Sequence, residues 1–364
     1  MAKFHTLTVK EAIQETSDAK SLSFDIPEEL KDTFQYKHGQ YLTLRFEIDG
    51  KDVRRAYSLC SSPITDGAPK VLSKRVKGGL VSNYINDHVK TGSQVMVFPP
   101  MGKFTFDLDE TKSTHYVLVS GGSGITPMMS ILKTVLEAEP KSRITLIYGN
   151  EKEEDIIFKD ALTEMAAKED RFQLCLALNH PPQGWEGEEG RLTQQNFEAI
   201  LQKHELLADL DQTEFYICGP QPMMDEVFAG FKNLGVPEEK QHVEYFTAPL
   251  PDETQKEETA DAQASTEAEE DFDESDVTIL IEGETHEIKV DKEDTILEVA
   301  IEEDIDPPYA CQMGICTTCK AKLHEGRVKM DETEGLTEQE IEEGYILTCQ
   351  SHPTTAKIKL EYEG

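Results

Sequence analysis

Four cysteines near the end of this 364-residue chain have a spacing suited to an iron–sulfur centre. Cys311, Cys316 and Cys319 follow one another as C-x4-C-x2-C, and Cys349 stands 30 positions after the third. An Fe2S2 core needs four converging thiolates, and this spacing supplies three of them from one short loop. The fourth would come from a neighbouring strand. The pattern therefore predicts a [2Fe–2S] cluster at these cysteines.

Structural zinc is the alternative use of four cysteines. Zinc sites are more often built from two C-x2-C pairs, whereas here the first gap holds four residues and the fourth cysteine stands alone. Gly314 would let the loop backbone approach a cluster closely, and amides around Thr317 and Thr318 could point at its sulfurs. These features favour the iron–sulfur interpretation.

Segments before residue 110 carry groups suited to a phosphorylated aromatic ligand. Arg55, Tyr57 and Ser58 lie in the pattern R-x-Y-S, in which a guanidinium suits phosphate and a tyrosine ring suits a flat π system. A glycine-rich turn follows at the start of a short helix, where backbone amides can face a pyrophosphate. The residues of this turn and helix start are Gly78, Gly79, Val81 and Ser82. These residues thus predict a site for a ligand that carries phosphate groups and a flat ring.

A second nucleotide site is indicated after residue 115, where a strand-like run leads into a glycine-rich turn and a helix. Thr126 is expected to cap this helix, and Pro127 suits its first turn. Exposed amides and the helix dipole would bind a pyrophosphate. The turn residues are Gly121, Gly122, Ser123, Gly124 and Thr126.

Further along, Cys218, Gly219 and Pro220 end another strand, which is where open α/β sheets bind ligands.

The surrounding pattern predicts three domains and a linker. Short strands with frequent turns indicate an antiparallel barrel over 1–110, and alternating strands and helices indicate a parallel sheet over 111–248. The acidic segment 249–275 should be a flexible linker, because residues 251–276 lack any aliphatic residue larger than Ala and are rich in carboxylates. A small domain with the cysteine loop would occupy 276–364.

Charge limits the classes of partner. The net charge of −35 disfavours binding to nucleic acid or to anionic membranes and favours partners with basic docking patches. A high-salt habitat is another possible cause of this acidity. Because no apolar run is long enough for a membrane span and no signal peptide is evident, we expect a cytoplasmic protein.

The motifs of residues 1–248, in their order, resemble the ferredoxin–NADP reductase family. The resemblance implies that Arg55 contacts the flavin phosphates, that Tyr57 packs against the isoalloxazine and that Ser58 hydrogen-bonds near its N5. The ending Pro100-Met101-Gly102-Lys103-Phe104 favours FAD over FMN.

For the second site, the resemblance implies that the turn at 121–126 meets the nicotinamide dinucleotide and that Cys218 lies beside the nicotinamide C4. Cys218 would be a wall of the site and not a nucleophile, because hydride passes directly to the flavin. Glu244 and Phe246 would lie near the flavin, so Ser58, Cys218 and Glu244 are the candidate catalytic residues.

Coenzyme preference is expected to depend on the residues after the second strand of this domain. Asn150 lies at this point as a candidate coenzyme-binding residue, and Glu151 would repel a 2′-phosphate, which slightly favours NADH. The neighbouring Lys152 is basic, so NADPH stays an alternative coenzyme.

The whole order, with a C-terminal plant-type ferredoxin of β-grasp fold, resembles the reductase components of multicomponent oxygenases. The resemblance implies transfer from NAD(P)H through FAD and [2Fe–2S] to a terminal oxygenase, most specifically a phenylacetyl-CoA epoxidase-type di-iron monooxygenase. Two alternatives stay open. One is a reductase for another redox metalloprotein, such as a hybrid-cluster protein. The other is an electron-carrier module with a degenerate flavin site.

Overall fold

The computed structural model describes residues 3–246, 274–281 and 283–362. The chain forms two compact units, of which the larger comprises 4–53 and 57–246 and the smaller contains the described residues from Glu274 on. The acidic linker expected at 249–275 lies outside the described residues, except that Glu274 and Ser275 begin a strand. No helix of the described segments combines the length and apolarity that a bilayer crossing requires.

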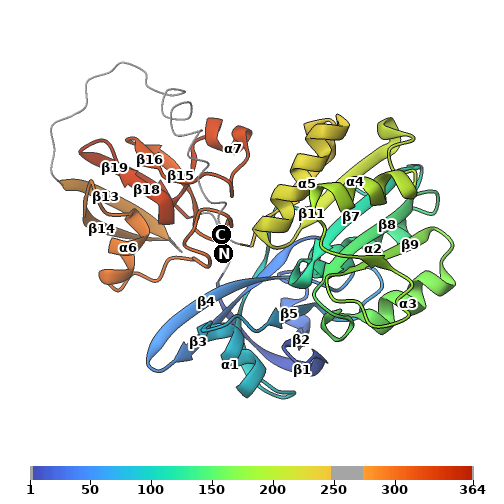
Figure 1. Ribbon diagram of the computed structural model, residues 1–364. Coiled ribbons are helices and arrows are strands. Elements are labelled where there is room, and N and C mark those ends of the chain that lie inside the picture. Colours follow the sequence, from blue (N-terminus) through green and yellow to red (C-terminus); the bar gives the residue numbers. More distant parts are fainter. Residues whose placement is uncertain (1–2, 247–273, 282, 363–364) are drawn as a thin grey trace. The chain divides into compact units, whose positions relative to one another are not determined.

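The first part of the larger unit is a six-stranded antiparallel sheet in the order β4-β3-β6-β1-β2-β5 (Figure 1). A bridge between Leu59 and Val71 links the chain after β4 to β5, the other edge of the sheet. Buried side chains such as Leu22 and Leu44 fill its interior. The strands are β1 His5–Thr16, β2 Ala19–Asp25, β3 Tyr41–Ile48, β4 Lys51–Ser58, β5 Lys70–Lys74 and β6 Gln94–Met101.

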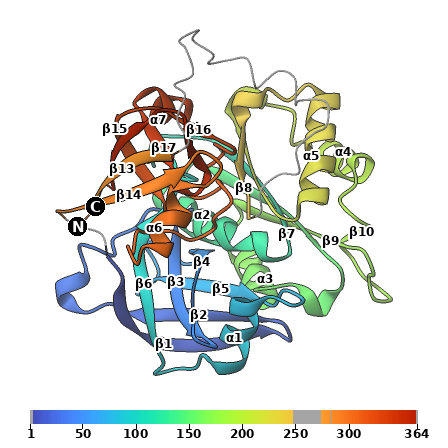
Figure 2. The ribbon, with the colours of Figure 1, turned by 90° about the vertical axis from the view of Figure 1, so that its left-hand side faces the viewer.

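One α-helix belongs to this antiparallel half-barrel. Helix α1, Leu80–His88, packs against β2, β3 and β5 (Figure 2). Lys20 of β2 ends the helix, because its ammonium group donates to the carbonyl oxygens of Ile85, Asn86 and Val89 at 3.4, 2.6 and 3.2 Å. A short 3-10 turn, η1, spans Glu28–Leu30.

The second part is a parallel sheet in the order β10-β9-β8-β7-β11-β12. The chain starts at β7, proceeds outward through β8, β9 and β10, and then returns to the other side of β7 for β11 and β12. A ligand crevice is expected between β7 and β11, where the strand order reverses. The strands are β7 His115–Gly121, β8 Arg143–Asn150, β9 Phe172–Leu178, β10 Glu188–Glu189, β11 Thr213–Cys218 and β12 Gln241–Glu244.

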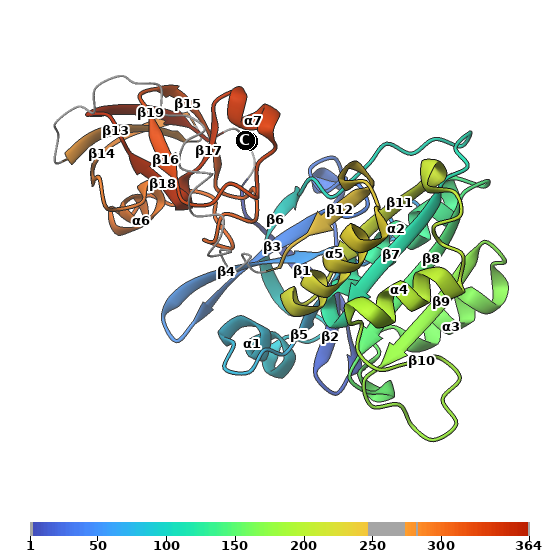
Figure 3. The same ribbon diagram turned by 45° about the horizontal axis from the view of Figure 1, so that its top comes forward.

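Helices cover both faces of the parallel sheet (Figure 3). Alternation along β7 explains this, because Tyr116 and Leu118 join one apolar core with α2 and α3, whereas Val117 and Val119 join another with α4 and α5. The helices are α2 Ile125–Ala138, α3 Lys159–Lys168, α4 Gln194–Lys203 and α5 Gln221–Leu234. Short 3-10 turns are η2 Gly122–Gly124, η3 Glu153–Asp155, η4 Leu210–Gln212 and η5 Glu238–Lys240.

Helix α2 also joins the two parts of the larger unit. The Ser130 hydroxyl donates to the Ser61 carbonyl at 2.6 Å, and the Thr134 hydroxyl donates to the Ser62 hydroxyl at 2.9 Å. Both bonds are buried. They fix the parallel sheet against the segment that follows β4.

The smaller unit contains a mixed sheet in the order β14-β13-β19-β15-β17. Strands β16 and β18 form a separate two-stranded sheet. The last strand, β19, pairs in parallel with β13, and α6 packs onto this core. The antiparallel sheet, the parallel sheet and this mixed sheet confirm the predicted fold class. The elements are β13 Glu274–Ile281, β14 Glu284–Asp291, α6 Ile296–Glu302, β15 Lys320–Glu325, β16 Val328–Met330, α7 Glu338–Glu342, β17 Tyr345–Leu347, η6 Thr348–Gln350, β18 Ser351–Pro353 and β19 Lys357–Glu361.

Candidate active site and iron–sulfur site

Two loops meet at the carboxyl ends of β7 and β11, and only glycine fits between them. A methyl group added at Gly124 would lie 2.1 Å from the Cys218 carbonyl oxygen. A methyl group at Gly219 would lie 2.5 Å from Cε of Met223 and 3.0 Å from the backbone nitrogen of Gly121. The glycines singled out in the sequence are therefore required by this close approach, which brings the turn at 121–126 and the segment 218–220 into one place.

No side chain of the N-cap residue caps the start of α2. Gly124 is the N-cap and has no side chain that could cap the helix, while the Ile125 amide donates to the carbonyl oxygens of Gly122 and Ser123. The expected capping role of Thr126 is wrong, because this residue lies inside the helix and its hydroxyl donates to the Ser123 carbonyl at 3.0 Å. The Tyr148 hydroxyl donates to the Gly122 carbonyl at 2.8 Å and fixes the turn. Uncapped amides at a helix start suit a pyrophosphate.

Ser120, Cys218 and Glu244 form a row across the same strand ends. Cys218 is the register partner of Ser120 on β7 and of Glu244 on β12. Burial raises the pKa of the Cys218 thiol well above its usual value, and Glu244 adds to this effect, so the thiol is neutral. A neutral thiol is compatible with a wall and unsuited to nucleophilic attack. The buried Ser120 hydroxyl, which the sequence motifs did not single out, has no hydrogen-bond partner among the described residues.

Glu244 has an unusual protonation equilibrium. Burial raises the pKa of its carboxyl group to about 8, and Lys103 opposes this shift only partly. The group is therefore largely protonated at neutral pH. Phe246 follows two residues later with 37% of its surface exposed. Glu244 therefore lies next to Cys218, whereas Phe246 follows the end of β12.

Asn150 and Glu151 lie at the end of β8, next to the glycine-rich turn. Asn150 is buried, and neither polar atom of its side chain makes a hydrogen bond of normal geometry with the described residues. Such a buried amide suits a ligand that supplies the missing partners. Glu151 accepts from the Asn179 amide at 2.8 Å and lies 3.8 Å from the Arg191 guanidinium and 3.6 Å from His180. Arg191 and His180 were not predicted.

The candidate flavin residues of the barrel lie on β4 and at the start of α1. Ser58 is buried at the end of β4, Tyr57 packs partly buried against the barrel core, and the Arg55 guanidinium donates to the Arg54 carbonyl at 2.7 Å. These three side chains occupy the last four positions of one strand.

The turn before α1 has the geometry of a phosphate-binding turn. Gly78 has a left-handed φ of 74°, and Gly79 is the N-cap of α1 without any side-chain cap. The Ser82 hydroxyl accepts from the Val76 amide at 3.1 Å and so holds the turn, while Val81 is buried beneath it. The first amides of α1 are thus left to a ligand.

The barrel also reaches the glycine-rich turn of the parallel sheet. Strand β5 contacts η2, and the Lys74 ammonium group lies 3.9 Å from where a methyl group on Gly122 would be. Gly102, with φ of 116°, lets the chain pass over the Tyr41 ring, and Phe104 packs against Tyr216 of β11. The two nucleotide-binding regions therefore belong to one continuous body.

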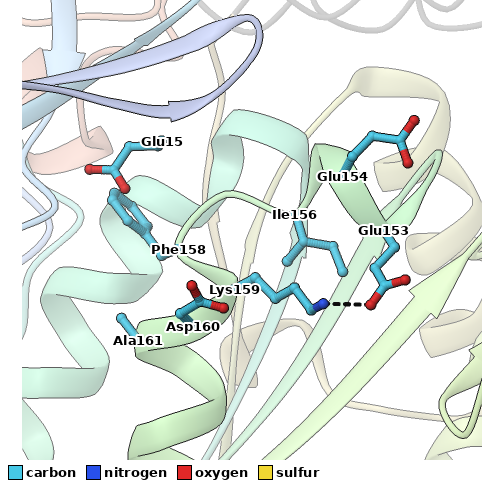
Figure 4. A pocket seen from close by; sticks show the side chains of 8 residues that line it. All are labelled: Glu15, Glu153, Glu154, Ile156, Phe158, Lys159, Asp160 and Ala161. Carbon is cyan, nitrogen blue, oxygen red and sulfur yellow. Dashed lines mark hydrogen bonds and ion pairs between the residues drawn. The ribbon is translucent and has the colours of Figure 1, made fainter.

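A separate pocket of about 550 Å3 opens between Glu15 of β1 and the start of α3 (Figure 4). Half of its lining residues are acidic, and Lys159 in it is paired with Glu153. None of the eight described residues that line it is a predicted site residue. This pocket is therefore distinct from the strand ends described above.

In the smaller unit, the cysteine loop before β15 and the short helix η6 bring the four thiols together as two neighbouring pairs. Cys311 contacts Cys316, Cys319 contacts Cys349, and Cys316 and Cys349 each interact with a thiol of the other pair. Cys316, Cys319 and Cys349 are buried. Among the described residues, no three His, Cys, Asp or Glu side chains are grouped around a point where a single ion would fit.

The cysteine loop turns its amides toward the sulfurs. Gln312 and Gly314 both have left-handed φ values, of 56° and 74°. The Met313 amide donates to the Cys311 sulfur at 3.3 Å, and the Gly314 amide donates to that of Cys349. Contact with the Cys316 thiol, together with the backbone amides of Met313, Cys316 and Ile315, lowers the pKa of Cys311 to about 6. Inward amides stabilise thiolates, so the four cysteines fit an iron–sulfur cluster.

Comparison with known families matches nearly the whole chain in three parts. Residues 6–106 match the oxidoreductase FAD-binding domain, residues 118–228 the oxidoreductase NAD-binding domain, and residues 279–354 the 2Fe-2S iron-sulfur cluster binding domain. The last match includes all four cysteines. The chain therefore has domains for FAD, a nicotinamide coenzyme and a [2Fe–2S] cluster, as predicted.

Relatives that match over their full length belong to oxygenase systems. One component of the 1,2-phenylacetyl-CoA epoxidase from Escherichia coli K12 is 33% identical over 100% of this chain and 99% of its own. The ferredoxin reductase component of 3-ketosteroid-9-alpha-monooxygenase from Rhodococcus rhodochrous is 36% identical over 98% of this chain and 96% of its own length.

Among solved structures, phthalate dioxygenase reductase is similar, with a TM-score of 0.58 at 22% identity over 99% of this chain and 98% of its own. That similarity concerns the fold. Because the sequence relatives are matched end to end, this chain belongs to the family of NAD(P)H-dependent, FAD- and [2Fe–2S]-containing electron-transfer reductases that serve multicomponent oxygenases.

Proposed function

We propose that the coenzyme binds at the strand ends of β7, β8 and β11 and that electrons leave the chain at the cysteines of the smaller unit. The observation that carries this assignment is the close approach of Gly124 to the Cys218 carbonyl, which forms a side-chain-free cradle beside the open start of α2. The turn 121–126 would hold the pyrophosphate, with Asn150, Gly219 and Pro220 completing the coenzyme site.

On this proposal, FAD is held by Arg55, Tyr57, Ser58 and the turn with Gly78, Gly79, Val81 and Ser82. Bound FAD supplies hydride acceptance and release of single electrons. Ser58 would orient the flavin ring, Cys218 would exclude water beside the nicotinamide, and Glu244 would hold a proton close by. Cys311, Cys316, Cys319 and Cys349 would bind the cluster.

NADH is the favoured coenzyme. Glu151 lies at the end of β8, the position from which an acidic side chain can bind the ribose hydroxyls of NADH, and it would repel a 2′-phosphate. Its contacts with Asn179 and Arg191 hold it there. Arg191, while paired with Glu151, is not free to attract that phosphate.

The favoured terminal partner is a di-iron monooxygenase of the phenylacetyl-CoA epoxidase type. The support is the end-to-end match with a component of such an enzyme, without unmatched domains in either chain. A 3-ketosteroid 9-alpha-monooxygenase is the second candidate. Its support is the Rhodococcus relative, which is 36% identical to this chain, against 33% for the epoxidase component. We place the reaction in the cytoplasm, since seven free cysteines suit a reducing compartment.

Anaerobic titration of the purified chain with NADH tests the electron path. Flavin absorbance should bleach first and the [2Fe–2S] signal should follow, with FAD released on denaturation. A preparation that contains the cluster but no flavin would support the carrier-module alternative instead. For the partner, the chain is combined with each purified oxygenase and its substrate. Coupled NADH oxidation with phenylacetyl-CoA and not with the steroid would support the epoxidase assignment, and the reverse result would overturn it.

A further inference from the structure

The side chain of Gln350 bridges the fourth cysteine and the cysteine loop. Its amide nitrogen donates to the Cys349 carbonyl at 2.9 Å and to the Gln312 carbonyl at 3.3 Å. The same nitrogen lies 3.8 Å from the Cys349 sulfur, within the range for a hydrogen bond to sulfur. All three neighbours are acceptors, so the nitrogen and not the oxygen of the amide must face them.

Other contacts fix Gln350 in this position. Its backbone carbonyl accepts from the Asp331 amide at 3.0 Å, and its Cγ lies 3.0 Å from where a methyl group on Gly314 would be. The side chain is therefore confined between η6 and the cysteine loop.

The bridge also acts on a strained part of the loop. Gln312 has a left-handed φ of 56°, which costs energy for a residue that is not glycine. This conformation presents the Gln312 carbonyl to Gln350 while the following amides face the sulfurs. Gln350 thus helps to stabilise the loop conformation on which the inward amides depend.

We propose that Gln350 is a positioning residue that sets the reduction potential of the [2Fe–2S] cluster through its hydrogen bond to Cys349. Reduction adds one negative charge to the cluster and its ligands. A donor to a ligand sulfur stabilises that charge and raises the potential. This inference rests on the proposed function, because it requires the four cysteines to hold the cluster.

The test compares the full-length holoprotein with Q350L, Q350E and the control Q339L. Leucine removes the donor at similar size, whereas glutamate keeps the shape and places a negative charge there. Gln339 lies exposed on α7 of the same domain, and its amide donates to Glu343 at 2.9 Å. The potential is measured by redox titration followed by electron paramagnetic resonance, with iron content determined for each protein.

We expect Q350L to shift the equilibrium toward the oxidised cluster about tenfold, which is about 59 mV for a one-electron couple. Q350E should lower the potential further, and Q339L should leave it unchanged. If Q350L loses its cluster, the isosteric Q350E decides the question. An unchanged potential in an iron-replete Gln350 variant would overturn the inference alone, whereas a wild-type chain that binds no iron would overturn the proposed function.

Discussion

Cys218 and Glu244 are register partners at the carboxyl ends of two parallel strands, and Glu244 makes the ionised form of the Cys218 thiol less favourable. The thiol is fully buried, and the carboxyl group is partly buried. Cys218 and Glu244 are both un-ionised and lie where the two proposed nucleotide-binding regions meet. They therefore add no negative charge at the place proposed for hydride transfer.

The raised pKa of Glu244 predicts a pH-dependent stability. Its pKa in the folded chain is about 8, above the ordinary 4.5, so the folded state binds more protons between these values. Its contribution is fully present below about pH 4.5 and is lost as the pH rises through 8. We expect E244Q to gain stability relative to the wild type as the pH rises from 5 to 9. Thermal unfolding across this range measures the difference, and parallel curves for the two proteins would contradict the assignment.

Coenzyme selectivity should change when Glu151 loses its charge. In E151Q, the carboxylate that repels a 2′-phosphate is gone and Arg191 is released from its ion pair. We expect kcat/KM for NADPH to rise about tenfold, equal to about 1.4 kcal/mol, with a smaller change for NADH. E164Q is the matched control, because Glu164 of α3 is paired with Lys168 and not with Arg191 or Lys152. Equal NADPH-to-NADH ratios in both variants would argue against this role.

The glycine cradle predicts a loss confined to the coenzyme step. In G124A, the new methyl group would meet the Cys218 carbonyl at 2.1 Å, so one of the two loops must move. We expect NADH-dependent flavin reduction to fall at least about tenfold and unfolding stability to drop by roughly 2 kcal/mol, while FAD stays bound. Stopped-flow reduction and flavin content measure these effects. G67A is the control, since nothing lies within 4 Å of a methyl group there. Wild-type reduction rates in G124A would refute the cradle.

Lys20 should stabilise α1 and, through it, the proposed flavin phosphate site. K20M removes an ammonium group that binds three carbonyls at the end of this helix. The expected cost is about 1 kcal/mol of unfolding free energy, together with weaker FAD retention during dialysis. K90M tests for a general effect of charge, because Lys90 is exposed just after α1. If both variants behave alike, the carbonyl contacts of Lys20 have no special role.

The sequence allowed accurate prediction where local pattern and spacing determine structure. The start of α6 follows from local sequence, because the Thr295 hydroxyl accepts a hydrogen bond from the Glu298 amide and caps the helix. By contrast, β1 was not predicted, since HTLTVKEAIQET mixes charged and apolar residues without clear alternation. Helix α4 was missed because only Phe197, Ile200 and Leu201 are buried along it.

Sequence motifs predicted which segments form the candidate site, but they did not predict which side chains lie next to one another across its strands. Gly121–Gly124 and Cys218 could be singled out because their types are unusual at strand ends. The row from Ser120 to Glu244 depends on the order β7-β11-β12, which local sequence does not determine. The pairing of Glu151 with Arg191 joins residues 40 positions apart and likewise depends on the fold.

The parallel pairing of β13 with β19 has a consequence for synthesis of the chain. The first and last strands of the smaller unit are neighbours inside its sheet, and Tyr362, just after β19, donates a hydrogen bond to Thr348, the residue before Cys349. This sheet cannot be completed until β19 has left the ribosome, whereas all strands of the flavin and nicotinamide domains precede it in the chain. The sheet that carries the cysteine site is therefore completed after the sheets of the two nucleotide domains, and a chain cut before β19 would lack the strand that closes it.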